Sequence, residues 1–326
     1  YYREEMYFEI EFQEYMQFKF RQQWMKLKAY ANEKGIQIIG DIPIYVAMDS
    51  ADTWANPWLF KLDENNEPTQ VAGCPPDGFS ATGQLWGNPL YRWDVHKNTG
   101  FEWWIKRLAH CFNMYDVVRI DHFRGFDEYY AIPYGDATAE NGWWEKGPGI
   151  DLFRAISASL GDREIIAEDL GYMTDSVKRL VEESGYPNMK VIEFAFDERD
   201  TGNASDYLPH NYPRNCVVYT GTHDNETLLS WLEDITPAER RQVRKYLNNF
   251  KDSGKELCND LICLVMQSVA NLCIVPMQDY LGLDNSARMN QPSTLGKNWK
   301  WRLKEGQFTA ELQKEMLELA TRYGRR

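Results

Sequence analysis

Two charged side chains interrupt an apolar run in VVRIDHFRGF, residues 117–126. The valines and the isoleucine predict a buried strand, in which Arg119 and Asp121 lie on the same face because they are two residues apart. His122 then points to the other face or enters the following loop. Burying a charge without a partner is costly. The pair is therefore either a structural ion pair that orients a turn or a reactive carboxylate held beside its cation.

Carboxylates and a histidine accompany other apolar runs of the chain. Asp41 lies in IQIIGDIPIYV, Glu168 lies in EIIAEDLG, and His223 and Asp224 follow CVVYT. If these runs are parallel strands, their polar ends lie near the pair described above. No spacing typical of a metal site accompanies them. Cleavage of a glycosidic bond needs such a set, with one carboxylate as nucleophile and another as proton donor.

The surroundings of the carboxylates favour different roles. Asp121 lies beside Arg119, which favours the ionised form that a nucleophile needs. Glu168 follows two isoleucines and an alanine, and an apolar setting favours the protonated form that a general acid needs. Asp224 could hold sugar hydroxyls or stabilise an oxocarbenium-like transition state. Each residue alone is weak support, because a single carboxylate at a strand end is as often structural.

Predicted helices alternate with predicted strands. Helical periodicity and capping signals predict helices over 18–34, 103–113, 151–160, 174–184, 236–247, about 258–272 and 309–323. Apolar runs predict strands over 36–46, 117–121, 164–171, 189–196, 216–225 (which runs into a loop) and 273–281. This alternation indicates an α/β fold with a parallel sheet.

Two arrangements of such a sheet are possible, a doubly wound sheet and a barrel. A nucleotide-binding doubly wound sheet favours a GxGxxG motif or a P-loop after a strand, and the sequence contains neither. A (β/α)8 TIM barrel brings all carboxyl ends of its strands to one face, where its active sites lie. The polar strand ends therefore favour the barrel.

A long insertion is expected at about 50–115, because the stretch between the first two strands exceeds an ordinary crossover. It is rich in Trp, Pro and Gly, as in WANPWLF and QLWGNPLY. The insertion is either a structural cap over the barrel mouth or a wall of acceptor subsites, and we favour the second. GWWEKGPG, residues 142–149, is a similar case, although its tryptophans could equally pack on outer helices.

Composition restricts the class of protein. Of 326 residues, 36 are Lys or Arg and 49 are Asp or Glu, for a net charge of −13, which argues against nucleic acid and anionic membranes as partners. The six cysteines form no CxxC pair and indicate reduced thiols in a cytoplasmic protein.

The apolar stretch 261–277 is interrupted by polar residues and Pro276. It therefore predicts a buried helix that runs into a strand, rather than a membrane span. No cofactor or metal is implied.

Several motifs together resemble the 4-α-glucanotransferases (amylomaltases) of glycoside hydrolase family 77, in the α-amylase superfamily. They are GDIPIYV (40–46), PPDGFSATGQLWGNPLY (75–91), VVRIDHFRGF (117–126), IIAEDLG (165–171), GTHDN (221–225) and RMNQPST (288–294). The second motif is the most specific, because generic α-amylases lack it. The resemblance covers essentially the whole chain.

The resemblance implies a role for each site residue. It assigns Asp121 as nucleophile, Glu168 as acid/base and Asp224 as transition-state stabiliser. It implies that maltooligosaccharides and other α-1,4-glucans are bound by Asp41, Asp77, Phe79, Gln84, Trp86, Arg119, His223 and Asn290. The activity implied is retaining transfer of glucan segments. Hydrolysis with water as acceptor is the alternative enzyme, and a non-catalytic glucan-binding protein is the alternative of another class.

The length of the chain departs from the family. A closed (β/α)8 barrel has eight strands, and six are predicted here. We therefore expect a single catalytic barrel domain over residues 1–326 that is N-terminally incomplete and lacks the first two β/α units.

Overall fold

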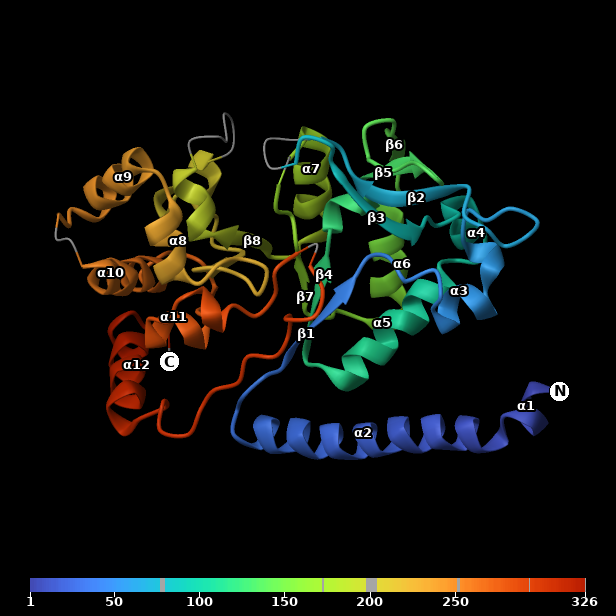
Figure 1. Ribbon diagram of the computed structural model, residues 1–326, viewed down its shortest axis with the longest axis horizontal. Coiled ribbons are helices and arrows are strands. Elements are labelled where there is room, and N and C mark those ends of the chain that lie inside the picture. The colour runs from blue at the N-terminus through green and yellow to red at the C-terminus, as the bar shows by residue number, and fades with distance from the viewer. Residues whose placement is uncertain (77–79, 172, 198–203, 251–252, 293, 326) are drawn as a thin grey trace. The chain divides into compact units, whose positions relative to one another are not determined.

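The computed structural model describes residues 1–76, 80–171, 173–197, 204–250, 253–292 and 294–325. Contacts between residues divide the chain into two compact units. The first unit comprises Tyr1–Asp169 and Thr174–Tyr186, and the second comprises Leu170–Met173 and Pro187–Arg326. Figure 1 labels the helices and strands of both units.

Three parallel strands form the centre of the first unit. They are β1 Ile39–Pro43, β4 Val117–Asp121 and β7 Ile165–Ala167, and β4 pairs with both of the others. Residues Val117, Val118, Arg119 and Ile120 of β4 are buried. A central parallel strand is covered on both faces, which explains its continuous apolar run and makes the buried arginine conspicuous.

Helices precede or follow each of these strands, as the alternating pattern predicts. They are α2 Tyr7–Glu33, α5 Glu102–Met114, α6 Ile150–Leu160 and α7 Asp175–Ser184. The Thr174 hydroxyl accepts the first cap bond of α7, and Gly185 ends that helix in the left-handed region with φ 71°. The unit also contains the short helices α1 Tyr2–Glu5, α3 Ala51–Ala55 and α4 Trp93–Asn98.

Helix α2 is longer than predicted. It begins at Tyr7 rather than at residue 18. Residues 1–17 contain neither Gly nor Pro, so nothing in the backbone opposes helix in this segment. Its aromatic side chains obscure the periodicity on which the prediction relied.

A second sheet of the first unit is antiparallel and was not predicted. Its strands, in spatial order, are β3 Gln84–Pro89, β2 Gln70–Cys74, β5 Glu128–Pro133 and β6 Trp143–Lys146. Two strands come from the predicted insertion and two follow β4. Trp144 on β6 packs against Tyr130 at 5.1 Å between ring centroids and against the Arg124 guanidinium at 4.0 Å, so it does not lie on an outer helix.

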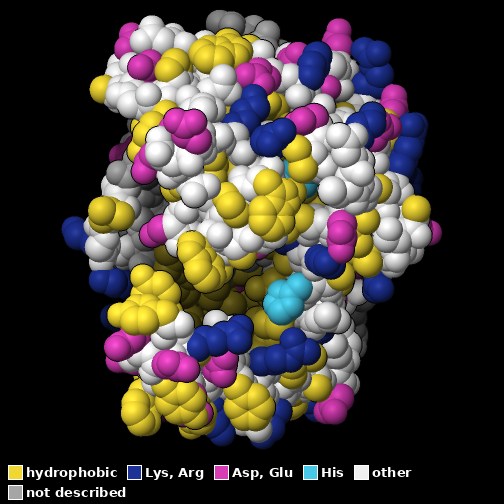
Figure 2. All heavy atoms as spheres, turned by 90° about the vertical axis from the view of Figure 1, so that its right-hand side faces the viewer, with side chains coloured by type: hydrophobic (Ala, Val, Ile, Leu, Met, Phe, Trp, Pro, Cys, Tyr) yellow, Lys and Arg dark blue, Asp and Glu magenta, His cyan; other side chains and the backbone are white. Residues whose placement is uncertain are grey.

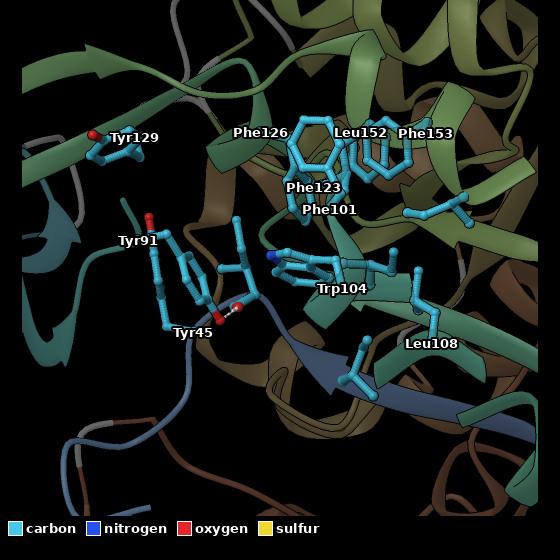
Figure 3. Close-up of a cluster of buried hydrophobic side chains, with 14 of the residues drawn as sticks. Tyr45, Tyr91, Phe101, Trp104, Leu108, Phe123, Phe126, Tyr129, Leu152 and Phe153 are labelled. Carbon is cyan, nitrogen blue, oxygen red and sulfur yellow. Dashed lines mark hydrogen bonds between the residues drawn. The ribbon is translucent and has the colours of Figure 1, made fainter. Parts of the chain in front are cut away.

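An aromatic cluster forms much of the core of the first unit (Figure 3). Trp104 and Tyr91 are fully buried, and their ring centroids lie 5.6 Å apart. The Tyr91 hydroxyl donates to the Ile44 carbonyl at 2.7 Å, which joins the segment after β1 to the segment before α4. This part of the aromatic content is therefore core.

Three parallel strands also form the centre of the second unit. They are β8 Asn188–Val191, β9 Cys216–Tyr219 and β10 Leu272–Ile274, with β9 between the others. The helices are α8 Leu228–Asp234, α9 Pro237–Leu247, α10 Gly254–Met266, α11 Met277–Leu281 and α12 Ala310–Arg322. Helix α9 begins with the predicted capping box of Thr236 and Glu239.

Two predicted strands of this unit are shorter than expected. The strand predicted over 189–196 ends at Val191, opposite Tyr219, and residues 192–196 form a 3-10 helix. The strand predicted over 273–281 ends at Ile274, and residues 277–281 are helical. Pro276 has no N–H to donate, which accounts for the second end.

Parallel strands alternate with helices in each unit, which confirms the predicted α/β class. Closure into a (β/α)8 barrel, the lack of two β/α units and the single domain with its insertion stay predictions. None of the helices in the described ranges combines the length and the apolar character that crossing a bilayer requires.

Candidate active site

The register of two neighbouring strands brings a cation between two carboxylates. Asp41 on β1 lies opposite Arg119 on β4. Arg119 Nη1 donates to both carboxylate oxygens of Asp41, at 2.7 and 2.8 Å, and Arg119 Nη2 lies 3.0 Å from Asp121 Oδ1. The arginine side chain is 8% exposed, whereas the carboxylates are 41% and 42% exposed. A buried cation thus fixes two accessible carboxylates.

The charge on Arg119 is stabilised by its neighbours. Burial alone would lower the pKa of the guanidinium, but the carboxylates of Asp41, Glu168 and Asp121 together raise this pKa above its ordinary value. The three carboxylates therefore favour the charged form of the arginine. It interacts electrostatically with Asp41, Glu168 and Asp121, the carboxylates of the predicted strands in the first unit.

Hydrogen bonds hold Glu168 beside His122, the residue that follows Asp121. Its backbone N–H donates to the Ile120 carbonyl at 3.1 Å, and its own carbonyl accepts from the Phe123 N–H at 2.9 Å. Its carboxylate oxygen Oε2 accepts from the backbone N–H of His122 at 2.6 Å. Glu168 is 9% exposed. The turn after β4 therefore orients this carboxyl group from one side.

His122 makes that contact possible through an unusual backbone conformation. Its φ is 55°, in the left-handed region that side chains other than glycine seldom adopt. Such conformations are frequent at functional sites. Burial and the positive charge of Arg124 lower the pKa of the His122 imidazole to about 3, so the ring is neutral. The sequence interpretation did not include His122 among the site residues.

Two predicted substrate-binding residues, Trp86 and Gln84, lie near His122. Trp86 contacts the His122 ring, and Gln84 is hydrogen-bonded to Trp86. The rings of Trp86 and His122 meet edge to face with centroids 4.8 Å apart. The Trp86 indole N–H donates to Gln84 Oε1 at 3.1 Å. Strand β3 of the antiparallel sheet is therefore in contact with the end of β4. Asp77 and Phe79, also predicted to bind substrate, lie outside the described residues.

A second group of predicted residues lies in the second unit. Asp224 Oδ2 is 3.3 Å from His223 Nε2, and Asp224 Oδ1 accepts from Asn290 Nδ2 at 2.5 Å. The Asn290 N–H donates to the His223 carbonyl at 3.0 Å, and Arg288 Nη2 donates to the Asp224 carbonyl at 2.6 Å. The structure thus brings these three predicted residues together.

Arg288 and Trp299 join this group, although the sequence interpretation did not select them. The Trp299 ring lies 5.1 Å from the His223 ring. Arg288 is the first residue of the motif RMNQPST, and Trp299 follows that motif. The motif lies between a short helix and a long irregular segment, so the sequence there shows neither helical nor strand periodicity. Within the described part of the chain, no group of three or more His, Cys, Asp or Glu side chains is arranged to hold a metal ion.

Comparisons with known proteins identify the family. A family model described as 4-alpha-glucanotransferase matches residues 1–309. The 4-alpha-glucanotransferase of Streptococcus pneumoniae is 50% identical over 325 residues, and that of Clostridium butyricum is 49% identical over 326 residues. These alignments cover 99% of the chain but 63% and 66% of the relatives. The chain therefore spans less than two thirds of the length of these relatives.

A solved structure is similar over the same extent. The amylomaltase from Streptococcus agalactiae in complex with acarbose matches with a TM-score of 0.94 and 42% identity, covering 99% of this chain and 64% of that one. The amylomaltase from Corynebacterium glutamicum matches with a TM-score of 0.70 at 18% identity, which supports the fold alone. The chain belongs to the 4-alpha-glucanotransferase family, glycoside hydrolase family 77.

Proposed function

We propose that this chain is the part of a 4-α-glucanotransferase that carries its catalytic carboxylates. The enzyme transfers a segment of an α-1,4-glucan to another glucan or to glucose. Because the chain spans 63% of the length of the Streptococcus pneumoniae relative, the activity is proposed for the chain together with the remaining segment of the family. The six free thiols support a cytoplasmic location.

The proposed reaction is a retaining double displacement in two steps. An Asp121 oxygen attacks the anomeric carbon, the glycosidic bond breaks, and Glu168 donates its proton to the leaving oxygen. Glu168 then removes the proton of an acceptor hydroxyl, whose oxygen attacks the same carbon and releases Asp121. This mechanism needs the two carboxyl groups about 5–5.5 Å apart.

The arrangement around Arg119 is the observation that carries this proposal. A buried cation 3.0 Å from Asp121 keeps that carboxylate ionised and fixes its direction. Glu168 interacts with the same cation and is held at one oxygen by the His122 amide. Two carboxylates are thus oriented from the ends of neighbouring strands. An ion pair that only oriented a turn would not need a second, separately oriented carboxyl group.

The remaining predicted residues are proposed to hold the sugar. Asp224 stabilises the positive charge that develops at the anomeric carbon, with His223 and Asn290 fixing its carboxylate. Asp41, Asp77, Phe79, Gln84, Trp86 and Arg119 are the proposed substrate-binding residues of the first unit. The predicted wall of acceptor subsites is supported by the contact of Trp86 with His122.

Incubation with maltotriose tests the proposal. The chain joined to the remaining segment of the Streptococcus pneumoniae relative should convert maltotriose into glucose and longer oligomers. Glucose and maltose alone would indicate the alternative, an α-glucan hydrolase with water as acceptor. Binding of maltotriose without any product would indicate a non-catalytic glucan-binding protein. An Asp121→Asn variant of the same protein is the control, because it keeps the fold and removes the nucleophile.

A further inference from the structure

The loop that carries His223 and Asp224 is closed by its own side chains. Asn225 Oδ1 accepts from the Thr222 N–H at 2.9 Å and from the Thr222 hydroxyl at 2.8 Å. The Thr222 hydroxyl also accepts from the Asp224 N–H at 3.3 Å. Residues Gly221–Asn225 are therefore a compact turn. The orientation of this turn depends on the side chain that lies beneath its first residue, Gly221.

The carboxyl group of Glu193 lies directly beneath Gly221. A Cβ atom at Gly221 would lie 2.8 Å from Glu193 Oε1, 3.3 Å from Glu193 Cδ and 3.1 Å from Asn225 Cβ. Any side chain at this position would displace the carboxyl group or the turn. Glu193 belongs to the 3-10 helix that continues β8, and only 4% of its surface is exposed. The end of one strand thus supports the loop that follows the next.

Glu193 is surrounded mainly by negative charge. Its burial, followed by the carboxylates of Asp279 and Glu226, raises the pKa of Glu193 well above its ordinary value, whereas Asn225 and Arg288 oppose the shift. Asp279, which is 3% exposed, accepts from the Thr220 hydroxyl at 2.5 Å and from the Leu228 N–H at 2.9 Å. Burial and these carboxylates therefore favour the neutral form of the Glu193 carboxyl.

The other partners of this region are already engaged. Glu226 Oε1 accepts from Asn285 Nδ2 at 2.7 Å and lies 3.8 Å from Arg288 Nη1. Arg288 also donates to the Asp224 carbonyl. Among the described residues, buried Glu193 Oε1 has no hydrogen-bond partner. An ionised Glu193 would place a third carboxylate beside Asp279 and Glu226, with its oxygen Oε1 still unpartnered, at a substantial cost.

We propose that Glu193 is a positioning residue, whose carboxyl group supports the Gly221–Asn225 loop and thereby orients Asp224. The inference rests on the proposed role of Asp224 in glucan transfer. A neutral carboxyl fills the space beneath Gly221, and its ionisation would repel Asp279 and Glu226 and disturb the loop that it supports. Glu193 does not touch the sugar in this proposal.

Two substitutions at this position separate shape from charge. Glu193→Gln keeps the volume and stays neutral at every pH, and Glu193→Ala removes the support. In the form of the protein that converts maltotriose, Glu193→Ala should lower kcat about tenfold and change KM less than about threefold, because Asp224 acts on the transition state. Glu193→Gln should keep kcat near the wild-type value at neutral pH.

Glu239 provides a matched control. It is a buried glutamate of the same unit, 7% exposed, and it caps helix α9 by accepting from the Thr236 N–H at 2.7 Å. Glu239→Ala should lower the melting temperature and leave kcat unchanged. A loss of kcat as large in Glu239→Ala as in Glu193→Ala would overturn the proposal, since destabilisation of the unit would then explain both. A Glu193→Gln variant whose kcat falls as far as that of Glu193→Ala would also overturn it, since a neutral side chain of the same volume should support the loop.

A measurement without substrate separates this inference from the proposed function. Because the folded-state pKa of Glu193 is raised, its contribution to stability is fully present below the unfolded pKa and is lost as pH rises towards the folded value. The difference in melting temperature between Glu193→Gln and wild type should therefore grow as pH rises above about 4.5. A constant difference would contradict the buried neutral carboxyl. The difference in melting temperature can grow with pH even if the protein does not convert maltotriose. In that case the proposed function is wrong, whereas the role of the Glu193 carboxyl in supporting the loop stands.

Discussion

Arg119 is the residue on which the first unit's carboxylates depend. It is buried, it bonds both oxygens of Asp41, and it lies 3.0 Å from Asp121. Arg119→Ala would leave these carboxylates without their cation and favour protonation of Asp121. We expect kcat to fall on the order of 10²-fold or more, with a smaller change in KM. Steady-state kinetics on maltotriose measure both values.

Arg119→Lys is the matched control for charge. It keeps the positive charge but cannot hold two carboxylates in the fixed geometry of a guanidinium. Its kcat should lie between those of wild type and Arg119→Ala. An Arg119→Ala variant with unchanged kcat and only a raised KM would show that Arg119 binds substrate without orienting the nucleophile.

Glu168 can be tested with a donor that needs no acid. Glu168→Gln cannot protonate a sugar oxygen, so turnover of maltooligosaccharides should be abolished. A glycosyl fluoride has a leaving group that departs without protonation, so the variant should still form a covalent intermediate on Asp121. Mass spectrometry of the denatured protein would detect the adduct. Absence of the adduct, with wild type reacting normally, would contradict the assigned roles.

The sequence predicted part of this site for a clear physical reason. Side chains two residues apart in a strand share a face, so the ion pair of Arg119 with Asp121 was predictable and is confirmed. The second partner, Asp41, depends on the register between β1 and β4, which one strand's pattern does not contain. His122 was missed for a similar reason, because its left-handed backbone, with φ 55°, leaves no signal in the strand pattern.

At the scale of elements, helix α4 contributes a buried histidine to the aromatic core. His96 is fully buried between the rings of Tyr91, Trp93 and Trp103, at centroid distances of 5.3, 5.3 and 5.8 Å. Burial lowers the pKa of His96 to about 4. The unfolded chain therefore binds this proton near pH 6.5 and the folded chain does not. Stability should fall as pH drops from about 6.5 to about 4, by roughly 3 kcal/mol.

His96→Phe isolates this contribution. A phenyl ring keeps the aromatic packing and does not titrate, so the variant should lose less stability than wild type between pH 7 and pH 4.5. Urea unfolding at several pH values measures the difference. His110, which is exposed on α5, is the control as His110→Gln. Identical pH profiles for wild type and His96→Phe would show that His96 does not oppose folding in acid.

The start of helix α9 can be tested independently of the site. The Thr236 hydroxyl accepts from the Glu239 N–H at 3.2 Å, and the Glu239 carboxylate accepts from the Thr236 N–H. Thr236→Ala removes one half of this capping box and should cost about 1 kcal/mol. Thr236→Ser keeps the hydroxyl and should cost less. Equal losses in both variants would attribute the effect to the lost methyl group.

Local signals explain which elements were predictable. The helices over 151–160, 174–184 and 236–247 were predicted because caps and glycines mark their ends, and each lies within a residue of its predicted range. The antiparallel sheet was missed because its central pair, β2 and β5, joins segments that lie far apart in the sequence. Strand β2 also carries Gly73, where a Cβ atom would clash with the Gln84 carbonyl oxygen. Glycine there permits close approach of β3 but weakens any strand pattern.

At the scale of the whole molecule, helix α2 exposes an unusual amount of apolar surface. None of its residues is buried. It is attached near its C-terminal end, where the Trp24 indole donates to the Met114 carbonyl at 2.8 Å and Lys28 donates to the Tyr115 carbonyl at 3.1 Å. The large apolar side chains that are at least about one third exposed are Tyr7, Phe8, Ile10, Phe12, Tyr15, Met16, Phe18, Phe20, Met25, Leu27 and Tyr30. Figure 2 shows hydrophobic side chains on the surface at its lower edge, at the height of α2 in Figure 1.

Such a surface favours self-association, because large apolar side chains gathered along one exposed helix can bury one another between copies of the chain. We expect the 326-residue chain, expressed alone, to be poorly soluble and without transferase activity although it contains Asp121, Glu168 and Asp224. Joining it to the remaining segment of the Streptococcus pneumoniae relative should restore both solubility and activity. Sedimentation velocity and the maltotriose assay test the two properties separately.

Substitutions on α2 distinguish this cause from general instability. Phe8, Phe12 and Phe18 are 80%, 58% and 59% exposed, so replacing them with Gln should raise the monomeric fraction and leave the melting temperature unchanged. Trp24→Gln, which removes a packed side chain with a hydrogen bond, should lower the melting temperature without raising the monomeric fraction. A wild-type chain that sediments as a soluble, active monomer would refute the expectation. An unchanged monomeric fraction in the triple variant would place the association on another surface.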